Sequence, residues 1–479
     1  MNLTDLIAIL PFAFLVVWAM ILLLVDLWVR PKWVIAVLAA LGLAASIGLA
    51  LAQASRPRLA FNNMVAVDGF AVYLNVLFLV CGLAAIALAY DYLKRAGIEH
   101  GEYYVLLLFS ISGMMLMAYA ADLIVVFLAL ELLSIPLYIL AGFNRARLES
   151  EEAALKYFLM GAFASGFVVY GVAMVFGSTA HTDLKGIVAV ITAGKAITPL
   201  LIAGAGLLLV GLGFKVAAVP FHMWTPDVYQ GAPSPVSGFM SVATKAAGFA
   251  ALLRIFSLAF PSLMGTLTPV IWGLAALTML VGNVLAIAQG NIKRMLAYSS
   301  IAHAGYILMA FVSYGAPKVA ADAVASSLFY LMAYGFASFG AWAVVVALEN
   351  AEGKGLELAD YAGLGRKYPW LAAAMLVFML SFTGVPPTLG FWGKFYLFRT
   401  AIESGQIALA LVGLLASLIS AYYYLRVVVV MYMRPGNPEA QGGVWINVAA
   451  VTAALATFLL GLAPGPLFDA ATQAVLRLF

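Results

Sequence analysis

The chain has 479 residues, of which 65% are hydrophobic and only 10% carry charge, whereas soluble domains carry about 25% charged residues. This low fraction of charged residues excludes a soluble enzyme. The 25 basic residues exceed the 21 acidic residues by only four and form no patch, which excludes a nucleic-acid-binding protein. Cys81 is the only cysteine, which excludes disulfides and thiolate-held iron–sulfur clusters within this chain.

Fourteen apolar runs follow one another along the chain. They lie at about 6–29, 33–52, 64–90, 103–119, 122–142, 153–177, 199–224, 234–259, 267–288, 294–314, 322–348, 369–401, 406–433 and 444–470. Unpaired backbone groups are costly in hydrocarbon, and the runs are continuous rather than alternating, so each must be helical and not a barrel strand. We therefore predict an all-α polytopic membrane protein with about 14 transmembrane helices.

The charges of the connections predict the orientation. Connections after odd-numbered helices hold twelve basic residues: Arg30, Lys32, Lys94, Arg95, Arg145, Arg147, Lys293, Arg294, Lys354, Arg366, Lys367 and Arg434. The others hold seven: Arg56, Arg58, Lys185, Lys195, Lys318, Arg399 and Arg477. Since cytoplasmic loops are enriched in Lys and Arg, both termini are expected outside. Asp5 stands where a signal peptide would be basic, so we expect the first helix to remain as an anchor.

Two runs are interrupted by proline well inside the predicted membrane region, the seventh near Pro220 and the twelfth near Pro386. Such breaks are tolerated where the backbone lines a wet cavity. They lie five helices apart, and because five is odd, corresponding breaks in two halves indicate inverted repeats.

We therefore predict four sections. They are an N-terminal three-helix segment at 1–100, a first five-helix repeat at 101–260, a second, inverted five-helix repeat at 261–435, and a C-terminal helix at 436–479.

Four charged residues stand inside apolar runs: Glu131, Lys215, Lys245 and Lys394. Each costs about 2.5 to 3.5 kcal/mol at the centre of a bilayer unless it is paired or hydrated. A structural ion pair of Glu131 with one lysine would leave two lysines without an acid. A proton path explains all four, because a buried lysine releases its proton more readily and a nearby carboxylate reverses this.

The remaining polar residues in apolar runs are weaker signals. His303 lies near hydroxyl side chains in the tenth run, and His222 follows Pro220 at the first break, so either could relay protons or simply pack. Lys156 follows three glutamates and is expected to be solvated. Arg254 and Arg426 are expected to anchor helix ends at headgroups, and Asp227 to serve as a turn or cap residue.

Several stretches carry a family resemblance. Residues 214–236 read FKVAAVPFHMWTPDVYQGAPSPV, residues 245–254 read KAAGFAALLR, residues 293–306 read KRMLAYSSIAHAGY and residues 386–395 read PPTLGFWGKF. With the fourteen-span layout, these closely resemble the N-subunit family of bacterial proton-pumping NADH:quinone oxidoreductase, respiratory complex I. The related M type would have a glutamate at position 394, where this chain has lysine, and the L type would add a long lateral helix.

The resemblance implies an antiporter-like membrane-arm subunit with a hydrated central axis. Lys215 would be the switchable proton carrier, Glu131 its modulator, Lys245 the central relay and Lys394 the terminal site, with His303 and His222 as bridges through water. It also implies no cofactor in this chain, with FMN, iron–sulfur clusters and quinone in partner subunits. Partners would be M-type and small membrane-arm subunits and lipids, in the bacterial inner membrane with both termini periplasmic.

Two alternatives remain open at this point. One is a subunit of a multisubunit sodium/proton antiporter, which would not copurify with flavin and iron–sulfur subunits. The other is a structural scaffold, for which Lys394→Ala would reduce assembly but leave the proton yield per electron intact.

Overall fold

The computed structural model describes residues 3–54, 56–193, 198–316, 318–474 and 476. Two of the basic residues counted for the orientation, Lys195 and Arg477, lie outside the described residues. Most of the described chain is helical, and its two strands, β1 and β2, form one short antiparallel hairpin.

The elements follow the predicted runs in order. The first part contains α1 (Leu3–Ala8), α2 (Leu10–Val25), α3 (Lys32–Leu51), β1 (Arg58–Ala60), β2 (Val65–Val67), α4 (Gly69–Arg95), α5 (Glu102–Tyr119), α6 (Leu123–Ala141), α7 (Leu148–Thr179), α8 (Leu184–Thr192), α9 (Pro199–Val216) and α10 (Trp224–Gly231). The middle part contains α11 (Ser234–Phe239), the π-helix η1 (Met240–Thr244), α12 (Lys245–Arg254), the π-helix η2 (Ile255–Ala259), the 3-10 helix η3 (Pro261–Leu263), α13 (Met264–Ile287), α14 (Ile292–Ser313) and α15 (Ala320–Leu348). The last part contains the 3-10 helix η4 (Leu358–Tyr361), α16 (Leu364–Lys367), α17 (Pro369–Thr383), α18 (Leu389–Glu403), α19 (Ile407–Met433), α20 (Val444–Leu462) and α21 (Gly465–Gln473).

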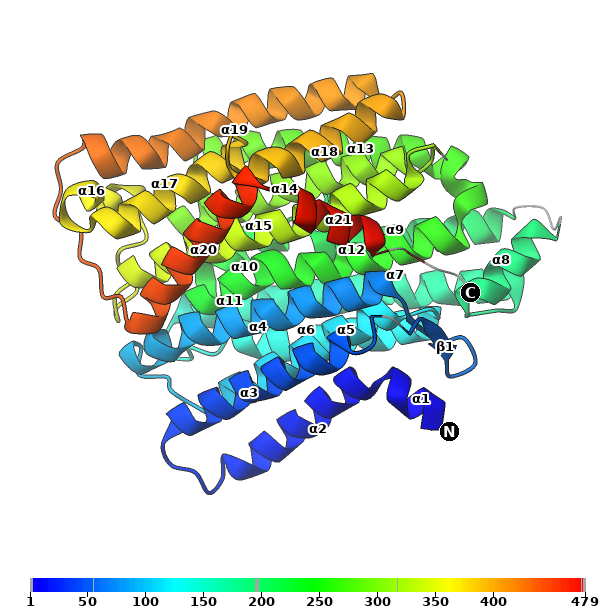
Figure 1. The fold of residues 1–479 in the computed structure, drawn as a ribbon, viewed down its shortest axis with the longest axis horizontal. Coiled ribbons are helices and arrows are strands. Elements are labelled where there is room, and N and C mark those ends of the chain that lie inside the picture. Colours follow the sequence, from blue (N-terminus) through cyan, green and yellow to red (C-terminus); the bar gives the residue numbers. More distant parts are fainter. Residues whose placement is uncertain (1–2, 55, 194–197, 317, 475, 477–479) are drawn as a thin grey trace.

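The prediction of an all-α polytopic membrane protein is confirmed. Among the described residues, twelve helical segments are long and apolar enough to cross a membrane, and α2 and α17 are shorter apolar helices. Each predicted apolar run contains one of these segments. Figure 1 shows the long helices lying side by side as one bundle.

The centre of the bundle is formed by the helical segment Ser234–Ala259, by α14 and by α15. About nine-tenths of the apolar window of each is buried, compared with 28% for α7 and for α20. A membrane helix that is shielded on all sides by other helices does not face lipid, so polar side chains on these three segments can contact protein or water.

The two ends of the bundle differ. The hairpin end carries α1, the β1–β2 hairpin and α8 (Figure 1), and isolated bridges join Val65 to Ala120 and Asp122 to Asp183 there. The basic end carries the connections that follow α2, α4, α6, α13, α15 and α19, which hold most of the twelve basic residues counted above. At this end a bridge joins Asn291 to Glu357.

Both predicted interruptions are present. α9 ends at Val216, where Ala217 has a φ of 61°, and α17 ends at Thr383, where Gly384 has a φ of 89°. A left-handed residue after the last turn ends a helix. The chain resumes as α10 in one case and as α18 in the other. The fold therefore places irregular backbone beside Lys215 and beside Lys394.

The prediction that Arg254 anchors a helix end at the headgroups is wrong. Arg254 is 1% exposed and forms two hydrogen bonds with Asp68, at 2.9 and 2.8 Å, and one with the carbonyl of Ala118. Arg426 likewise binds protein, because its guanidinium donates to the carbonyls of Ile287 and Gln289 after α13. Both arginines therefore join helices within the bundle.

We expect the Arg254–Asp68 pair to be essential for stability. Arg254→Met keeps much of the side-chain volume but leaves the buried Asp68 without its arginine, a change that costs about 3 to 5 kcal/mol. Thermal denaturation of the purified assembly, followed by loss of this chain, should show a midpoint lower by several degrees. The control is Arg399→Met, which breaks the exposed Arg399–Glu403 pair and should cost at most about 1 kcal/mol. Equal shifts for the two variants would contradict this ranking.

Candidate functional site

The first group of the site joins α6, α7 and α9. Lys215 stands at the end of α9, where its Nζ donates to Ser134 Oγ at 2.8 Å and to Tyr157 Oη at 2.9 Å. Ser134 lies on α6 three residues after Glu131, so the two share a helix face. Glu131 is partly buried and accepts a hydrogen bond from Ser165 on α7. Glu131 and Lys215 are thus neighbours that contact separate hydroxyl groups.

The second group surrounds Lys245. This residue begins α12 directly after the π-helix η1, and its Nζ donates to the carbonyl oxygen of Ser300 at 2.6 Å and to Ser300 Oγ at 2.9 Å. Short π-helical segments often occur at functional positions. Gly248, one turn further, packs against the side chain of Lys215. The missing side chain at Gly248 lets α9 and α12 approach closely, so the Lys215 and Lys245 groups adjoin.

The third group is centred on His303 of α14. Its Nδ1 lies 2.5 Å from Tyr330 Oη and its Nε2 lies 3.0 Å from Tyr424 Oη. A neutral imidazole donates through one nitrogen and accepts through the other. The Tyr424 hydroxyl also lies 2.5 Å from Ser299 Oγ. His303 therefore sits in a continuous row of hydroxyl groups from α14, α15 and α19.

The fourth group surrounds Lys394 of α18. Its Nζ donates to the carbonyl of Thr383 at 3.1 Å and to Ser417 Oγ at 2.8 Å, and it lies 4.8 Å from the centre of the Tyr306 ring. Thr383 is the last residue of α17, so its carbonyl is one of those that the break leaves without a helical partner. The ring of Tyr306 also contacts that of His303, at 5.9 Å between centres. Tyr306 therefore links the third group to the fourth.

His222 is the predicted residue with the fewest contacts. It is buried in the turn between α9 and α10, and its Nδ1 has no hydrogen-bond partner among the described residues. The structure places it at the first break, as the sequence predicted, but does not join it to the row formed by the other groups.

The three lysines share one feature. All three are buried: Lys215 is 2% exposed, Lys245 is 3% exposed and Lys394 is 4% exposed. The nine ion pairs found within the described part of the chain include none of the three lysines and do not include Glu131. The static ion pair of Glu131 with a lysine, considered above, is therefore not present. Within the described residues, the hydrogen bonds of these buried amines go to hydroxyl and carbonyl oxygens.

Sequence reasoning missed most of the partners of these residues. The missed partners are Ser134, Tyr157, Ser165, Ser300, Tyr330, Ser417 and Tyr424. Ser134 was detectable, because it lies three residues after Glu131 on one helix. The others come from helices far apart in the sequence, where an isolated serine or tyrosine gives no periodic signal.

Asp227 was predicted to serve as a turn or cap residue, and this is wrong. It lies on α10 and pairs with Lys156 at 2.7 Å and with Arg294 at 2.6 Å. Lys156 is partly exposed, as predicted, and also pairs with Glu152. Burial by itself raises the pKa of Asp227, but hydrogen bonds from Lys156 and Arg294 outweigh it, so the pKa of Asp227 is lowered from its usual value. Asp227 therefore connects α7, α10 and α14 at the basic end.

This lowered pKa gives a pH test. A carboxylate whose pKa is lower in the folded state stabilises the fold above its unfolded pKa, and loses that contribution as the pH falls through the folded value. Asp227→Asn should therefore lower the thermal midpoint of the assembly by the same amount at every pH from about 5 to 8. The difference from the unsubstituted protein should narrow only below about pH 4. A difference that changed between pH 6 and 8 would show that another group is responsible.

Metal-ligating side chains do not gather in this site. Across the described ranges no group of three or more His, Cys, Asp or Glu residues could hold a metal ion, and Cys81 is buried alone. These residues do not fit a thiolate-held cluster.

The chain is similar to membrane subunits of known complexes. The family model described as NADH:quinone oxidoreductase/Mrp antiporter, TM matches residues 120–420. NADH-quinone oxidoreductase subunit N of Trichlorobacter lovleyi is 46% identical over 476 residues, which cover 98% of this chain and 96% of that protein. The subunit N of Chloroflexus aggregans is 46% identical over 475 residues, with 97% and 96% coverage.

Two solved structures are also similar to this chain over nearly its whole length. A chain of respiratory complex I from Thermus thermophilus with bound aureothin has a TM-score of 0.83 and 38% identity, covering 97% of this chain and 99% of that one. A chain of the Mrp complex from Dietzia sp. has a TM-score of 0.86 at 19% identity, with 98% and 97% coverage, and so shares the fold alone. The predicted resemblance is confirmed: the chain belongs to the family of NADH:quinone oxidoreductase and Mrp antiporter transmembrane subunits, and its full-length relatives are the N subunits of NADH-quinone oxidoreductase.

Proposed function

We propose that this chain is the proton-translocating, antiporter-like N subunit of the membrane arm of an NADH:quinone oxidoreductase. One observation carries the proposal: Lys215, Lys245 and Lys394 are buried and contact hydroxyl and carbonyl oxygens but no carboxylate within the described chain. A permanently charged amine in that setting is costly. An amine that gains and loses a proton as water reaches it is charged only for part of the cycle.

The contacts support a role for each residue. Lys215 is the switchable carrier, and Glu131 modulates it from the same α6 face that holds Ser134. If Glu131 moves closer, the ammonium form of Lys215 is favoured; if it moves away, Lys215 releases its proton. Lys245 is the central relay and Lys394 the terminal site. His303, His222 and the tyrosine hydroxyls bridge the lysines, with water in the gaps.

The energy for transport must come from other subunits. Moving one charge across a membrane works against about 2.3 kcal/mol per 100 mV. Electron transfer from NADH to quinone supplies it through FMN, iron–sulfur clusters and quinone, which we place in partner subunits. The single cysteine of this chain, Cys81, cannot supply the thiolates of an iron–sulfur cluster.

The surroundings of the chain follow from the same proposal. We assign it to the bacterial inner membrane, beside an M-type subunit and small membrane-arm subunits, with lipid around the exposed helices and both termini on the periplasmic side. The basic end then faces the cytoplasm, as the excess of basic residues favours.

We also propose that 101–260 and 261–435 are inverted repeats. Two features support this: each section contains one broken helix, and each break follows a left-handed residue near a buried lysine.

Lys215→Ala and Glu131→Ala test the assignments. In the whole complex reconstituted into vesicles, NADH-driven proton pumping should fall roughly tenfold or more for Lys215→Ala, since a positioned proton carrier contributes about a hundredfold or more to transfer. A smaller fall is expected for Glu131→Ala, which leaves the carrier in place. The control is Lys318→Ala, which removes an exposed lysine between α14 and α15. Unchanged pumping in both site variants would refute the roles of Lys215 and Glu131.

Lys394→Ala separates transport from scaffolding. We expect this variant to assemble, because Lys394 is 4% exposed and so does not form part of the outer surface of the bundle, and to pump several-fold more slowly. Poor assembly with an unchanged proton yield per electron would instead support a scaffold. Flavin and iron–sulfur centres should copurify with the chain; their absence from an active preparation would favour a sodium/proton antiporter.

A further inference from the structure

A second cluster of buried charge lies outside the row of lysines, at the basic end. Glu349 directly follows α15 and is 0% exposed. Its Oε1 accepts from Tyr92 Oη at 3.3 Å and from Arg147 Nη1 at 3.1 Å, and its Oε2 accepts from Ser234. These donors come from α4, the start of α7 and α11, so Glu349 joins four elements.

Lys293 supplies an additional buried cation. Its Nζ donates to the carbonyl of Ala232 at 2.6 Å, two residues before Ser234, and it interacts electrostatically with both Glu349 and Arg147. No carboxylate lies within ion-pair distance of Lys293 in the described chain. The cluster thus holds one carboxylate and three basic side chains, which are Arg147, Lys293 and Arg95 of α4. Tyr361 of η4 also interacts electrostatically with Glu349. Because basic side chains outnumber carboxylates in this cluster, the loss of a proton from one of them lowers the net buried charge. In a balanced ion pair the same loss would leave a charge without a partner.

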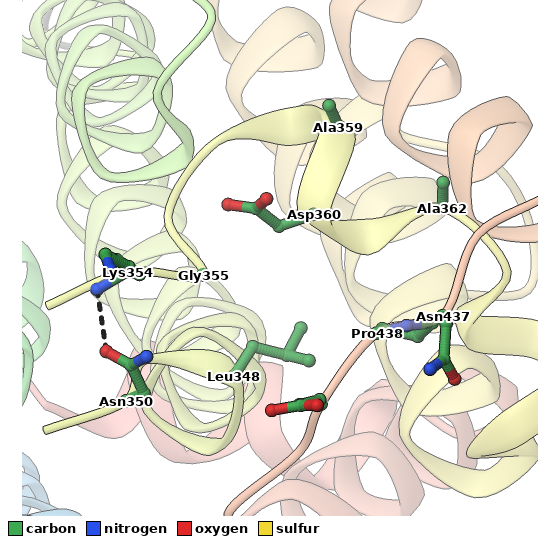
Figure 2. A pocket seen from close by; sticks show the side chains of 10 residues that line it. Leu348, Asn350, Lys354, Gly355, Ala359, Asp360, Ala362, Asn437 and Pro438 are labelled. Atoms are coloured by element: carbon green, nitrogen blue, oxygen red, sulfur yellow. Dashed lines mark hydrogen bonds between the residues drawn. The ribbon is translucent and has the colours of Figure 1, made fainter. Parts of the chain in front are cut away.

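Two features bring water close to this cluster. The side chain of Arg147 is 27% exposed although its partner Glu349 is not. A polar pocket of about 320 Å³ opens at the same end and is lined by both chain neighbours of Glu349, Leu348 and Asn350. Figure 2 shows the pocket, with the side chain of Asp360 directed into it. At its edge the backbone N–H of Lys354 donates a hydrogen bond to the side-chain oxygen of Asn350. The pocket is large enough for several water molecules.

Two helices lead from the cluster to the lysine row. On α14, Ser300 lies seven residues after Lys293, which is two helical turns and so the same face; Ser300 binds Lys245. On α15, Ser338 lies eleven residues before Glu349, which is three turns, and its Oγ is 2.8 Å from Ser241 Oγ. The polar faces of α14 and α15 therefore extend along the bundle from the Glu349 cluster toward Lys245.

One aromatic layer separates the two regions. Trp342 and Tyr229 are buried, with ring centres 6.4 Å apart, and Trp342 packs on Gly238. The hydroxyl of Tyr229 has no hydrogen-bond partner within the described residues, while Ser300 lies beside it. A buried hydroxyl without a partner is costly. A water molecule or a proton-bearing group that arrives from either side would satisfy it.

We propose that Glu349, together with Lys293, is the proton-exchange site between water at the basic end and Lys245, with the Tyr229–Trp342 layer as its gate. This rests on the proposed function and adds the entry point to it. A proton from water binds the Glu349 carboxylate and releases Arg147. Once Lys293 has released its own proton toward Lys245 and is a neutral amine, the carboxylic acid passes its proton to that amine or to water on the inner side. The regenerated carboxylate pairs with Arg147 again.

The experiment uses the whole complex in proteoliposomes. Glu349→Gln keeps the size of the side chain and an oxygen that can accept from Tyr92, and its amide nitrogen can donate to Ser234 Oγ, but it cannot carry a proton. Lys293→Arg keeps the charge and a donor for the Ala232 carbonyl, but arginine does not release its proton. We expect NADH-driven pumping to fall roughly tenfold in both, with a larger solvent deuterium isotope effect on NADH oxidation. Glu349→Asp should recover part of the pumping.

Glu352→Gln is the matched control, since this exposed carboxylate lies three residues from Glu349 on the same loop. It should pump normally. Wild-type pumping and isotope effects in Glu349→Gln and Lys293→Arg would overturn the assignment. If Glu349→Gln fails to assemble, Lys293→Arg decides alone.

Lys245→Ala, measured in parallel, separates the two proposals. If Lys245→Ala stops pumping while Glu349→Gln and Lys293→Arg do not, the entry site is wrong and the transport function stands. If Lys245→Ala also pumps normally, the assignment of Lys245 as the central relay is wrong.

Discussion

The cost of holding charge in an apolar interior governs this structure. The chain keeps Glu131 and three lysines inside its bundle, where each charge costs several kcal/mol unless oxygen atoms or water stabilise it. The carbonyl of Thr383 at the second break accepts from Lys394, and hydroxyl and carbonyl groups of regular helices accept from Lys215 and Lys245. The buried amines therefore depend on oxygen atoms from several different helices.

The buried cations fall into two classes that differ in chemistry. Arg254 and Arg147 each face a carboxylate, Asp68 and Glu349 respectively, and join helices from distant parts of the chain. Lys215, Lys245 and Lys394 face hydroxyl groups and carbonyls. Arginine stays charged and so requires a permanent partner, whereas lysine can be neutral. This division separates structural pairs from groups suited to proton transfer. Lys293 and Glu349 combine both features, which is why the entry site is placed there.

The lysine row gives this chain a set of buried groups that can hold and release protons. Small changes in the electrostatic interaction between Glu131 and Lys215 would suffice, because Glu131 shares a face of α6 with Ser134, to which Lys215 of α9 donates a hydrogen bond. A shift of α6 or α7 driven by a neighbouring subunit would alter that electrostatic interaction and hence the proton affinity of the first lysine.

The sequence alone determined the fold class, the fourteen apolar runs, the two breaks and the four charged residues, because hydrocarbon penalises unpaired backbone and charge wherever they lie along a chain. It did not determine whether a given charge has a partner. Arg254 and Asp68 are 186 residues apart, and Asp227 meets Lys156 and Arg294 from two other helices. Only tertiary packing decides such contacts, since the local pattern around each residue is the same whether its partner is lipid, water or a distant side chain.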